Sequence, residues 1–303
     1  MVSIKKNYKD FISDFEFHKG HPWNGAYSGI IDNKIYLPFL FKDYGEYIPD
    51  FYYYKDEYGF LPLSSGACKC RINTKEFLNF LKMEKRLVLK HTHSEVGRGF
   101  LLLDYVDSNK YHVNDKDIDE NDLIYLLDSL RDYVVQEYIV QHDAIAKINP
   151  SSLNTLRLLL VWNPNLNSFV VGRCFQRFGC NGNVVDNLGS GNGILVYVDP
   201  VSGKYCNYGV MNVRGEGDIF VENIKHPNSG YLFKGNEVVN YSIIKEQIIK
   251  IFNAISFLKF VALDVAITND GFKIIETNSY PDPAVAQYKY GFKADPNFSI
   301  LFK

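Results

Sequence analysis

Short apolar runs alternate with helical patterns along most of this chain. Apolar residues recur at helical spacing in residues 242–258, where Ile244, Ile248 and Ile251 fall on one face, and a second amphipathic helix is expected at 123–133. Runs of strand length, rich in β-branched residues, cover 86–90, 100–106, 133–139, 155–162, 169–177 and 193–199. Residues 208–240 are expected to be irregular, and Thr74 and Ser242 to cap helices. The mixture of the two periods predicts an α+β fold.

The first part of the chain has a different character. Residues 1–66 are rich in tyrosine, are interrupted by prolines and show no long helical period. A surface of tyrosines is able to stack on sugar rings or bases, but an irregular layer packed on the main body explains the pattern better. We therefore expect an aromatic segment of 1–66 that packs against the rest of the protein.

The most informative stretch is 260–283, in which two apolar runs flank Asn269, Asp270 and Gly271. Such punctuation is typical of a β-hairpin. A three-residue loop pairs Asp264 with Glu276 and leaves Asn278 on the same face, whereas a two-residue loop sets Asp264 opposite Thr277. Oxygen-bearing side chains on one face suit a hard cation, most plausibly Mg²⁺ with nucleotide phosphates, although a solvated hairpin face is the alternative. The candidate metal ligands are Asp264, Glu276 and Asn278.

A second candidate site follows the strand at 86–90. That strand ends in Lys90, and a loop with Ser94, Gly97 and Gly99 leads to the next strand. A lysine anchored on a strand can reach phosphates, and glycines let backbone N–H groups approach phosphate oxygens closely. The loop matches no common phosphate-binding motif, so an ordinary hairpin loop is the alternative.

Three further groups of polar residues interrupt apolar surroundings. Glu137 lies near the end of the strand at 133–139 and Asp143 follows it, where they are placed to present a backbone edge to a base and a carboxylate to a ribose; a strand that enters a short helix ended by Pro150 is the alternative. An arginine inside an apolar strand is costly unless it faces a cleft or an anion. The long segment 179–193 is rich in glycine and asparagine, and loops of this kind are often functional, flexible disorder being the alternative. The candidates are Arg157, Arg173 and Arg177 for an anion-binding face, and Asp186 and Asn187 for the substrate.

Composition narrows the class of protein. A chain of 303 residues with 46% hydrophobic residues is able to bury a large core. Lys and Arg total 33 against 35 Asp and Glu, a net charge of −2 that gives no field for nucleic acid. The N-terminus lacks an apolar export segment, no apolar run is long enough for a membrane span, and five cysteines form no disulfide pattern. A globular protein of the cytoplasm is expected.

Taken in order, these features resemble the ATP-grasp superfamily. They are Lys90 before a glycine loop, the hinge QEYI at 136–139, Arg157, Asp264 and the sequence IIETN at 274–278. More narrowly, the segments EYIVQHDAIAKINPSSLNTLRL, QRFGCNGNVVDNLGSGNGI and ETNSYPDPAVAQ look like the sugar-transfer-associated branch of bacterial polysaccharide gene clusters. The resemblance covers about residues 70–290.

The resemblance implies an ATP-grasp fold of two α+β subdomains with antiparallel sheets that grip ATP. Residues 67–137 would be the small lid subdomain and 138–303 the catalytic, metal-binding one. Lys90 would contact phosphates, Asp264, Glu276 and Asn278 would bind Mg²⁺, and an upstream lysine, Lys69 or Lys75, would be a second ATP contact. Arg157 would face the transferring phosphoryl group, and Arg173 or Arg177 would orient a substrate carboxylate. The residues implied for the adenine and ribose are Gln136, Glu137, Tyr138, Ile139 and Asp143.

The family reaction implied is ATP-dependent ligation of a small-molecule carboxylate and an amine through an acyl phosphate. The expected acid is a sugar acid or nucleotide sugar in capsule or O-antigen synthesis. Other interpretations remain open at this point: a peptide or amino-acid ligase of the same fold, a small-molecule kinase, or a nucleotide- or glycan-binding protein without turnover. The sequence makes no prediction of oligomeric state.

Overall fold

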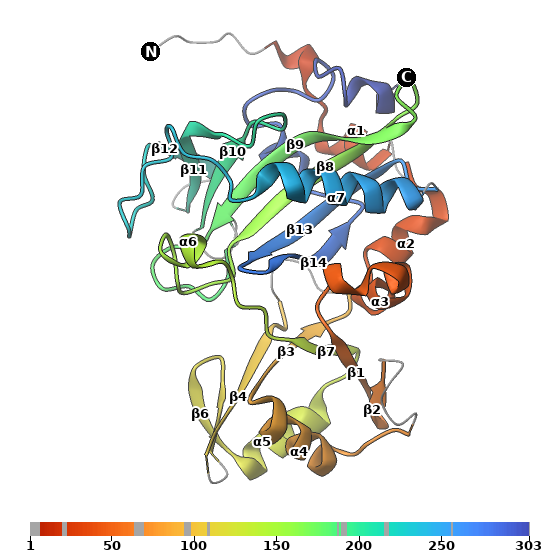
Figure 1. The fold of residues 1–303 in the computed structure, drawn as a ribbon, viewed down its shortest axis with the longest axis vertical. Coiled ribbons are helices and arrows are strands. Elements are labelled where there is room, and N and C mark those ends of the chain that lie inside the picture. The colour runs from red at the N-terminus through yellow and green to blue at the C-terminus, as the bar shows by residue number, and fades with distance from the viewer. Residues whose placement is uncertain are drawn as a thin grey trace.

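Two antiparallel sheets form the framework of the molecule (Figure 1). The structure is a computed structural model that describes residues 7–19, 23–63, 70–93, 98–107, 110–186, 188, 193–214, 218–255 and 257–302. The smaller sheet has the strand order β2-β1-β7-β3-β4-β5-β6. Its strands are β1 (Phe51–Asp56), β2 (Gly59–Pro62), β3 (Arg86–His91), β4 (Leu101–Asp107), β5 (Lys110–Val113), β6 (Lys116–Asp119) and β7 (Tyr133–Glu137).

The larger sheet has the order β12-β11-β10-β9-β8-β13-β14 and lies above the smaller one in Figure 1. Its strands are β8 (Thr155–Asn163), β9 (Ser168–Phe178), β10 (Ile194–Val198), β11 (Tyr205–Arg214), β12 (Asp218–Asn223), β13 (Phe260–Thr268) and β14 (Gly271–Asn278). The connection from β7 to β8 carries the chain from one sheet to the other and includes the short helix α6 (Asp143–Ala146).

Helices cover both sheets and bury apolar side chains against them. Against the smaller sheet, α4 (Thr74–Glu84) buries Phe77 and α5 (Glu120–Ser129) buries Leu123. On the larger sheet, α7 (Tyr241–Ala254) buries its isoleucine face, in which each fully buried side chain contributes about 2 kcal/mol. The opposite face packs against α1 (Asp14–Lys19), α8 (Pro283–Ala286) and the C-terminal segment. The larger sheet is therefore covered on both faces, which holds its polar inner residues in fixed positions.

The β13–β14 hairpin confirms the pairing of Asp264 with Glu276 but corrects its explanation. The turn contains two residues, Asn269 and Asp270, because Thr268 pairs with Gly271. A regular ladder from that turn would place Ile275 opposite Asp264. Instead the register shifts after Val265, Ile275 becomes the extra residue of a β-bulge, and Glu276 comes to lie opposite Asp264.

The other sequence expectations are mostly confirmed. Each predicted strand corresponds to a strand of the structure, and both predicted helices are present. The expectation of irregular structure at 208–240 was wrong, because β11 and β12 form a hairpin there. The expected caps were also wrong: Asn73 forms a capping box with Glu76, and Asn240, with a φ of 55°, precedes α7 without a side-chain cap.

Two parts of the N-terminal segment pack against different sheets. β1 and β2 join the smaller sheet through β7, whereas α2 (Ser28–Ile31) and α3 (Leu37–Leu40) lie beside β14 (Figure 1). Two contacts tie α2 to the end of β14: the Thr277 hydroxyl donates to the Ile31 carbonyl at 2.6 Å, and the Ser279 N–H donates to Asp32 at 2.6 Å. The segment thus spans both sheets; the division at residues 66 and 137 remains a prediction.

Candidate functional site

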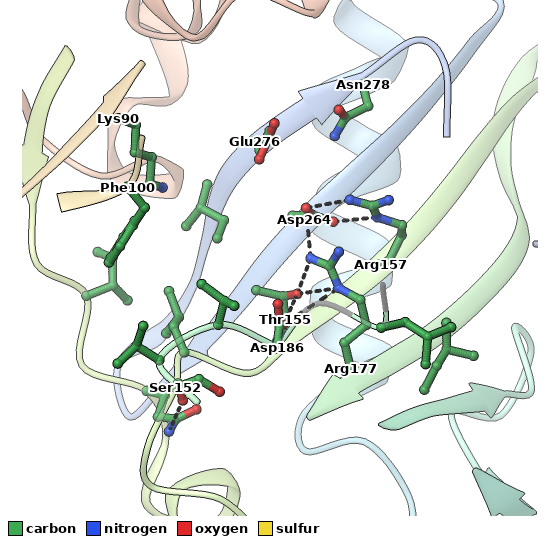
Figure 2. A pocket seen from close by; sticks show the side chains of 18 of the residues that line it. Lys90, Phe100, Ser152, Thr155, Arg157, Arg177, Asp186, Asp264, Glu276 and Asn278 are labelled. Carbon is green, nitrogen blue, oxygen red and sulfur yellow. Dashed lines mark hydrogen bonds and ion pairs between the residues drawn. The ribbon is translucent and has the colours of Figure 1, made fainter. Parts of the chain in front are cut away.

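A cavity of about 1140 Å³ lies between the two sheets and contains most of the predicted site residues. Lys90 and Phe100 enter it from the smaller sheet, and Figure 2 shows them facing the carboxylates and arginines of the larger one. The predicted residues that line the cavity are Lys90, Gln136, Glu137, Tyr138, Ile139, Asp143, Arg157, Arg177, Asp186, Asp264, Glu276 and Asn278. The fold therefore brings together residues from 90 to 278 in one cavity.

Asp264 is the most tightly held of these residues. Arg157 grips it with two hydrogen bonds, from Nε to Oδ1 and from Nη2 to Oδ2, both of 2.6 Å, and Arg177 Nη2 lies 2.8 Å from Oδ2. The side chain is 3% exposed. Burial by itself favours the neutral acid, but the two guanidinium groups hold the pKa of Asp264 well below its usual value. The carboxylate is consequently ionised throughout the physiological range.

Glu276 and Asn278 lie on the neighbouring strand β14, whose end contacts the N-terminal segment. Lys34, in the single turn Lys34–Tyr36, lies 3.1 Å from Glu276 Oε1 and is 5% exposed. Its backbone N–H donates to the Thr92 carbonyl beyond β3 at 3.1 Å. Lys34 therefore bridges the two sheets at the site.

Sequence analysis did not find Lys34. Of the two upstream lysines considered, Lys69 lies outside the described residues, and Lys75 is exposed on α4 beside a different, smaller cavity. The residues around Lys34 form no motif that indicates this contact, which joins residues more than 200 positions apart in the sequence.

Lys90 lies at the end of β3, on the cavity wall. Burial lowers the pKa of Lys90 to about 8, although Glu276 opposes this shift and Lys34 reinforces it. Of the loop residues predicted with it, Ser94 and Gly97 lie outside the described residues. Gly99 has a φ of 70°, and a Cβ atom there would lie 2.7 Å from the Tyr133 hydroxyl, so both its backbone and its surroundings favour glycine.

The hinge at 136–139 borders an apolar slot. Val88, Phe100 and Leu102 line it from the smaller sheet, and Ile275, turned toward the cavity by the bulge, lines it from the larger one. The Gln136 side chain is 1% exposed, and its Nε2 has no hydrogen-bond partner among the described residues. A buried amide donor beside an apolar slot is suited to the polar edge of a flat ring.

The neighbouring polar groups of the hinge are already engaged. Glu137 donates its N–H to the Asp50 carbonyl at 2.9 Å and accepts the Asp50 N–H on its carboxylate at 3.1 Å. The Arg86 guanidinium lies 4.7 Å from the centre of the Tyr138 ring. Asp143 accepts from the Asn269 side chain at 3.2 Å, which joins α6 to the tip of the β13–β14 hairpin.

The other end of the cavity is organised by Thr155. Its N–H and hydroxyl both donate to Asp186, at 2.8 and 2.6 Å, and its hydroxyl accepts from Arg177. Burial raises the pKa of Asp186, with Arg177 and Thr155 opposing the shift. Asn187 lies outside the described residues. Thr155 was not predicted, yet it precedes Arg157 by two positions in β8, and this spacing places both side chains on one face of the strand.

Arg173 is separated from the other two arginines. Its Nη1 lies 2.7 Å from Asp295 Oδ2, its Nη2 donates to the Tyr290 carbonyl at 2.9 Å, and the C-terminal segment covers it. It is absent from the residues that line the cavity. Burial lowers the pKa of Arg173. The structure therefore places Arg173 in a contact that fastens the C-terminal segment to the sheet.

The donor set at Asp264, Glu276 and Asn278 is compatible with magnesium. Two carboxylates and an amide from adjacent strands offer only hard oxygen ligands, and all three residues line the cavity. The buried Asn278 Nδ2 has no hydrogen-bond partner among the described residues, so this amide is available to a group bound in the cavity. In the described part of the chain, no cluster of three or more His, Cys, Asp or Glu is arranged as a metal site. The predicted set, with two carboxylates, is smaller than such a cluster.

Comparison with solved structures finds ATP-grasp enzymes. D-alanine–D-alanine ligase from Bacillus anthracis aligns with a TM-score of 0.44 and 11% identity, over 90% of this chain and 65% of that one. Carboxyaminoimidazole ribonucleotide synthase from Aspergillus clavatus, complexed with ATP, aligns with a TM-score of 0.44 and 10% identity, over 89% and 54%. The ATP-grasp ligase PsnB with its minimal precursor gives 0.41 and 9%, over 87% and 57%. The chain thus spans between 54% and 65% of these proteins' lengths.

No curated protein matches the chain in sequence. Among the described residues, no helix is long and apolar enough to cross a membrane. A family model described as sugar-transfer associated ATP-grasp matches residues 23–295, which extends the expected resemblance toward the N-terminus and includes Lys34. Because that match covers most of the chain, the protein belongs to the sugar-transfer-associated ATP-grasp family and has the ATP-grasp fold.

Proposed function

We propose that this protein is an ATP-dependent carboxylate–amine ligase, which joins an acid to an amine as an amide through an acyl phosphate. One observation carries the proposal most strongly: the carboxylates of Asp264 and Glu276 share a cavity with Lys90 of the opposite sheet and with Arg157 and Arg177. Anionic and cationic groups in one enclosed space are what phosphoryl transfer between small molecules needs.

In this proposal the nucleotide lies between the sheets. The adenine occupies the slot beside the hinge, where the buried Gln136 amide and backbone groups of 137–139 meet its polar edge. Asp143, at the exposed edge of the same cavity, is the candidate for the ribose. Lys90 binds the phosphates from the smaller sheet, and Lys34, near it and paired with Glu276, is the second lysine.

Asp264, Glu276 and Asn278 are the residues that would hold Mg²⁺. The bound ion would neutralise charge on the phosphate oxygens and fix their orientation. The protein already balances these carboxylates with cations of its own, since Arg157 and Arg177 contact Asp264 and Lys34 contacts Glu276.

Two arginines are assigned to the reacting groups. Neither the Nη1 of Arg157 nor that of Arg177 is engaged in the contacts described above, and both residues line the cavity. We assign Arg157 to the transferring phosphoryl group and Arg177 to the substrate carboxylate. The carboxylate oxygen attacks the γ-phosphorus and ADP leaves; the amine then attacks the acyl carbon and inorganic phosphate leaves. Enclosure between the sheets protects the acyl phosphate from water.

We further propose that the acid is a sugar acid or a nucleotide-linked sugar, and that an amino acid or simple amine is attached to it during polysaccharide synthesis in the cytoplasm. The description of the matching family, sugar-transfer associated ATP-grasp, supports this assignment. The amine and the acid would meet at the end of the cavity formed by Arg177, Asp186 and the strands β10–β12.

An isotope experiment tests the reaction. Purified protein is given ATP, Mg²⁺, an amine and a panel of uronic acids labelled with ¹⁸O in the carboxylate, and products are analysed by mass spectrometry. The ligase releases ADP and phosphate only when acid and amine are both present, and one ¹⁸O atom appears in the inorganic phosphate. A new amide mass identifies the pair of substrates.

The same experiment separates the other candidate functions. A kinase transfers phosphate to a hydroxyl and needs no amine, so no ¹⁸O reaches inorganic phosphate. A binding protein retains ATP without turnover over the whole panel. Either result would overturn the ligase assignment.

A further inference from the structure

Thr155 holds together three parts of the cavity wall that are distant in sequence. It is the first residue of β8 and is 2% exposed. Its hydroxyl donates to Asp186 Oδ2 at 2.6 Å and accepts from Arg177 Nε at 3.0 Å and Nη2 at 2.6 Å. Figure 2 shows this group of contacts directly below Asp264.

The hydroxyl has its full set of hydrogen bonds in this arrangement. A threonine hydroxyl has one donor hydrogen and two acceptor lone pairs. Asp186 takes the hydrogen, and the two N–H groups of Arg177 occupy the lone pairs. A valine side chain has nearly the same shape but offers neither function, so it would leave Asp186 and Arg177 facing each other at 3.6 Å without this intermediary.

The backbone of Thr155 is fixed by its own surroundings. Thr155 pairs with Ala266 of β13, and its neighbour Asn154 is fully buried in a network with Gln141, Asn149 and Gly179. This network does not contact Asp264 or Glu276 in any hydrogen bond described here. The Thr155 backbone is thus held in place, and its hydroxyl is able to orient the side chains of Arg177 and Asp186.

Two site elements depend on this contact. Arg177 directs Nη2 to Asp264, and its two contacts with the Thr155 hydroxyl fix the plane of the guanidinium. Asp186 lies in the connection between β9 and β10, and its bond to the Thr155 N–H and hydroxyl is what fastens that connection to the sheet. Both elements border the end of the cavity assigned to the acid and the amine.

We infer that Thr155 is a positioning residue: its hydroxyl sets the orientation of Arg177 and fastens the Asp186 connection over the acceptor end of the cavity. The inference rests on the ligase function proposed above for its kinetic consequences. It does not place Thr155 in contact with a substrate.

The test compares three variants under the conditions that support wild-type turnover. Thr155→Val removes the hydroxyl, Thr155→Ser keeps it, and Thr74→Val is the matched control, because the hydroxyl of the buried Thr74 also donates to a carboxylate, that of the exposed Asp128, outside the cavity. Thr155→Val is expected to lower kcat by about 10- to 100-fold and to raise KM for the acid, with KM for ATP unchanged within about twofold. Thr155→Ser should recover kcat to within about threefold of wild type, and Thr74→Val should retain it.

A merely structural role predicts a different pattern. Activity would then fall only in proportion to the folded fraction, and the KM values for the acid and for ATP would change by the same factor. Wild-type kcat in Thr155→Val, or a Thr155→Ser variant no better than Thr155→Val, would overturn the inference. Should the wild-type protein have no turnover, the proposed function fails first, and hydrogen exchange then decides. Backbone amides of 180–186 should exchange several-fold faster in Thr155→Val and return to wild-type rates in Thr155→Ser; equal rates in all three proteins would contradict the positioning role.

Discussion

Asp264 lies directly opposite Glu276 across the β13–β14 hairpin, and a β-bulge at Ile275 creates this pairing. The bulge has two consequences for the cavity. It returns Glu276 to the face that carries Asp264, and it directs Ile275 into the slot beside the hinge. A single irregularity in the strand therefore serves both the proposed metal ligands and the proposed base-binding slot.

Glu276→Gln tests the role of this carboxylate. The substitution keeps shape and hydrogen bonding but removes a charge, so turnover should fall by at least roughly 100-fold, equivalent to about 3 kcal/mol of transition-state stabilisation. Steady-state phosphate release measures the loss, and circular dichroism checks the fold. Asp270→Asn, the same chemical change at the exposed tip of the hairpin, is the control and should retain activity. Undiminished turnover in Glu276→Gln would remove Glu276 from the metal site.

Lys34→Met tests whether the N-terminal segment belongs to the site. Removing a buried ammonium leaves Glu276 without its partner, and breaking such a pair should destabilise the metal-free protein by about 3 kcal/mol. The double variant Lys34→Met with Glu276→Gln removes both charges and should recover most of that loss. Urea unfolding without nucleotide or metal measures all four proteins. A double variant destabilised by the sum of the two single effects would show that the two charges do not interact.

The sequence predicted well those parts of the fold that depend on local periodicity. The strands of β8 and β9 and the isoleucine face of α7 follow from the spacing of apolar residues, because burial selects the same face at every turn or alternate residue. The β11–β12 hairpin was missed because its residues, from Tyr205 to Asn223, mix polar, glycine and aromatic positions without a clean alternation.

Contacts between distant segments were harder to predict. The Asp264–Glu276 pairing was predicted through the wrong turn, since a bulge is invisible to a count of loop residues. The Lys34–Glu276 pair depends on α2 being fastened to β14 by Thr277, a contact with no periodic signature. Arg157, Arg173 and Arg177 looked equivalent in sequence, and only the path of the C-terminal segment separates Arg173 from the other two.

Lys90 gives the protein a predictable dependence on pH. Burial lowers the pKa of Lys90 to about 8, so the ammonium that we propose binds phosphate is mostly present below pH 8 and mostly lost above it. ATP affinity should therefore fall about fivefold between pH 8 and pH 9. Calorimetric titration with MgATP at constant ionic strength measures this.

Lys90→Ala is the variant for that experiment. It should bind ATP more weakly at pH 7 and should show a flatter pH dependence, since the titrating group is gone. The free energy of unfolding without nucleotide should respond in the opposite direction and rise with pH. Between pH 8 and the ordinary lysine pKa near 10.4, Lys90 keeps its proton in the unfolded chain but has lost it in the folded protein. Raising the pH in this range therefore stabilises the folded protein. An ATP affinity that is unchanged in Lys90→Ala would remove Lys90 from the phosphate site.

Substitutions of Arg173 and Arg177 should have different effects, a loss of stability for Arg173 and a loss of turnover for Arg177. Arg173 pairs with Asp295 and holds the C-terminal segment, so Arg173→Met should destabilise the protein by about 3 kcal/mol while the turnover of each folded molecule stays near wild type. Arg177 contacts Asp264 and Thr155 inside the cavity, and Arg177→Lys, which keeps the charge but loses the planar fork, should lower turnover by roughly 100-fold.

The two arginine variants are compared by normalising kcat to the folded fraction from unfolding curves at the assay temperature. Arg173→Lys is the matched control for Arg177→Lys, since both exchanges keep a positive charge on β9. The expected contrast arises because Arg173 lies under the C-terminal segment, whereas Arg177 of the same strand lines the cavity. Only Arg177 is placed to reach a reacting group. A normalised kcat that falls equally in both lysine variants would return Arg173 to the active site.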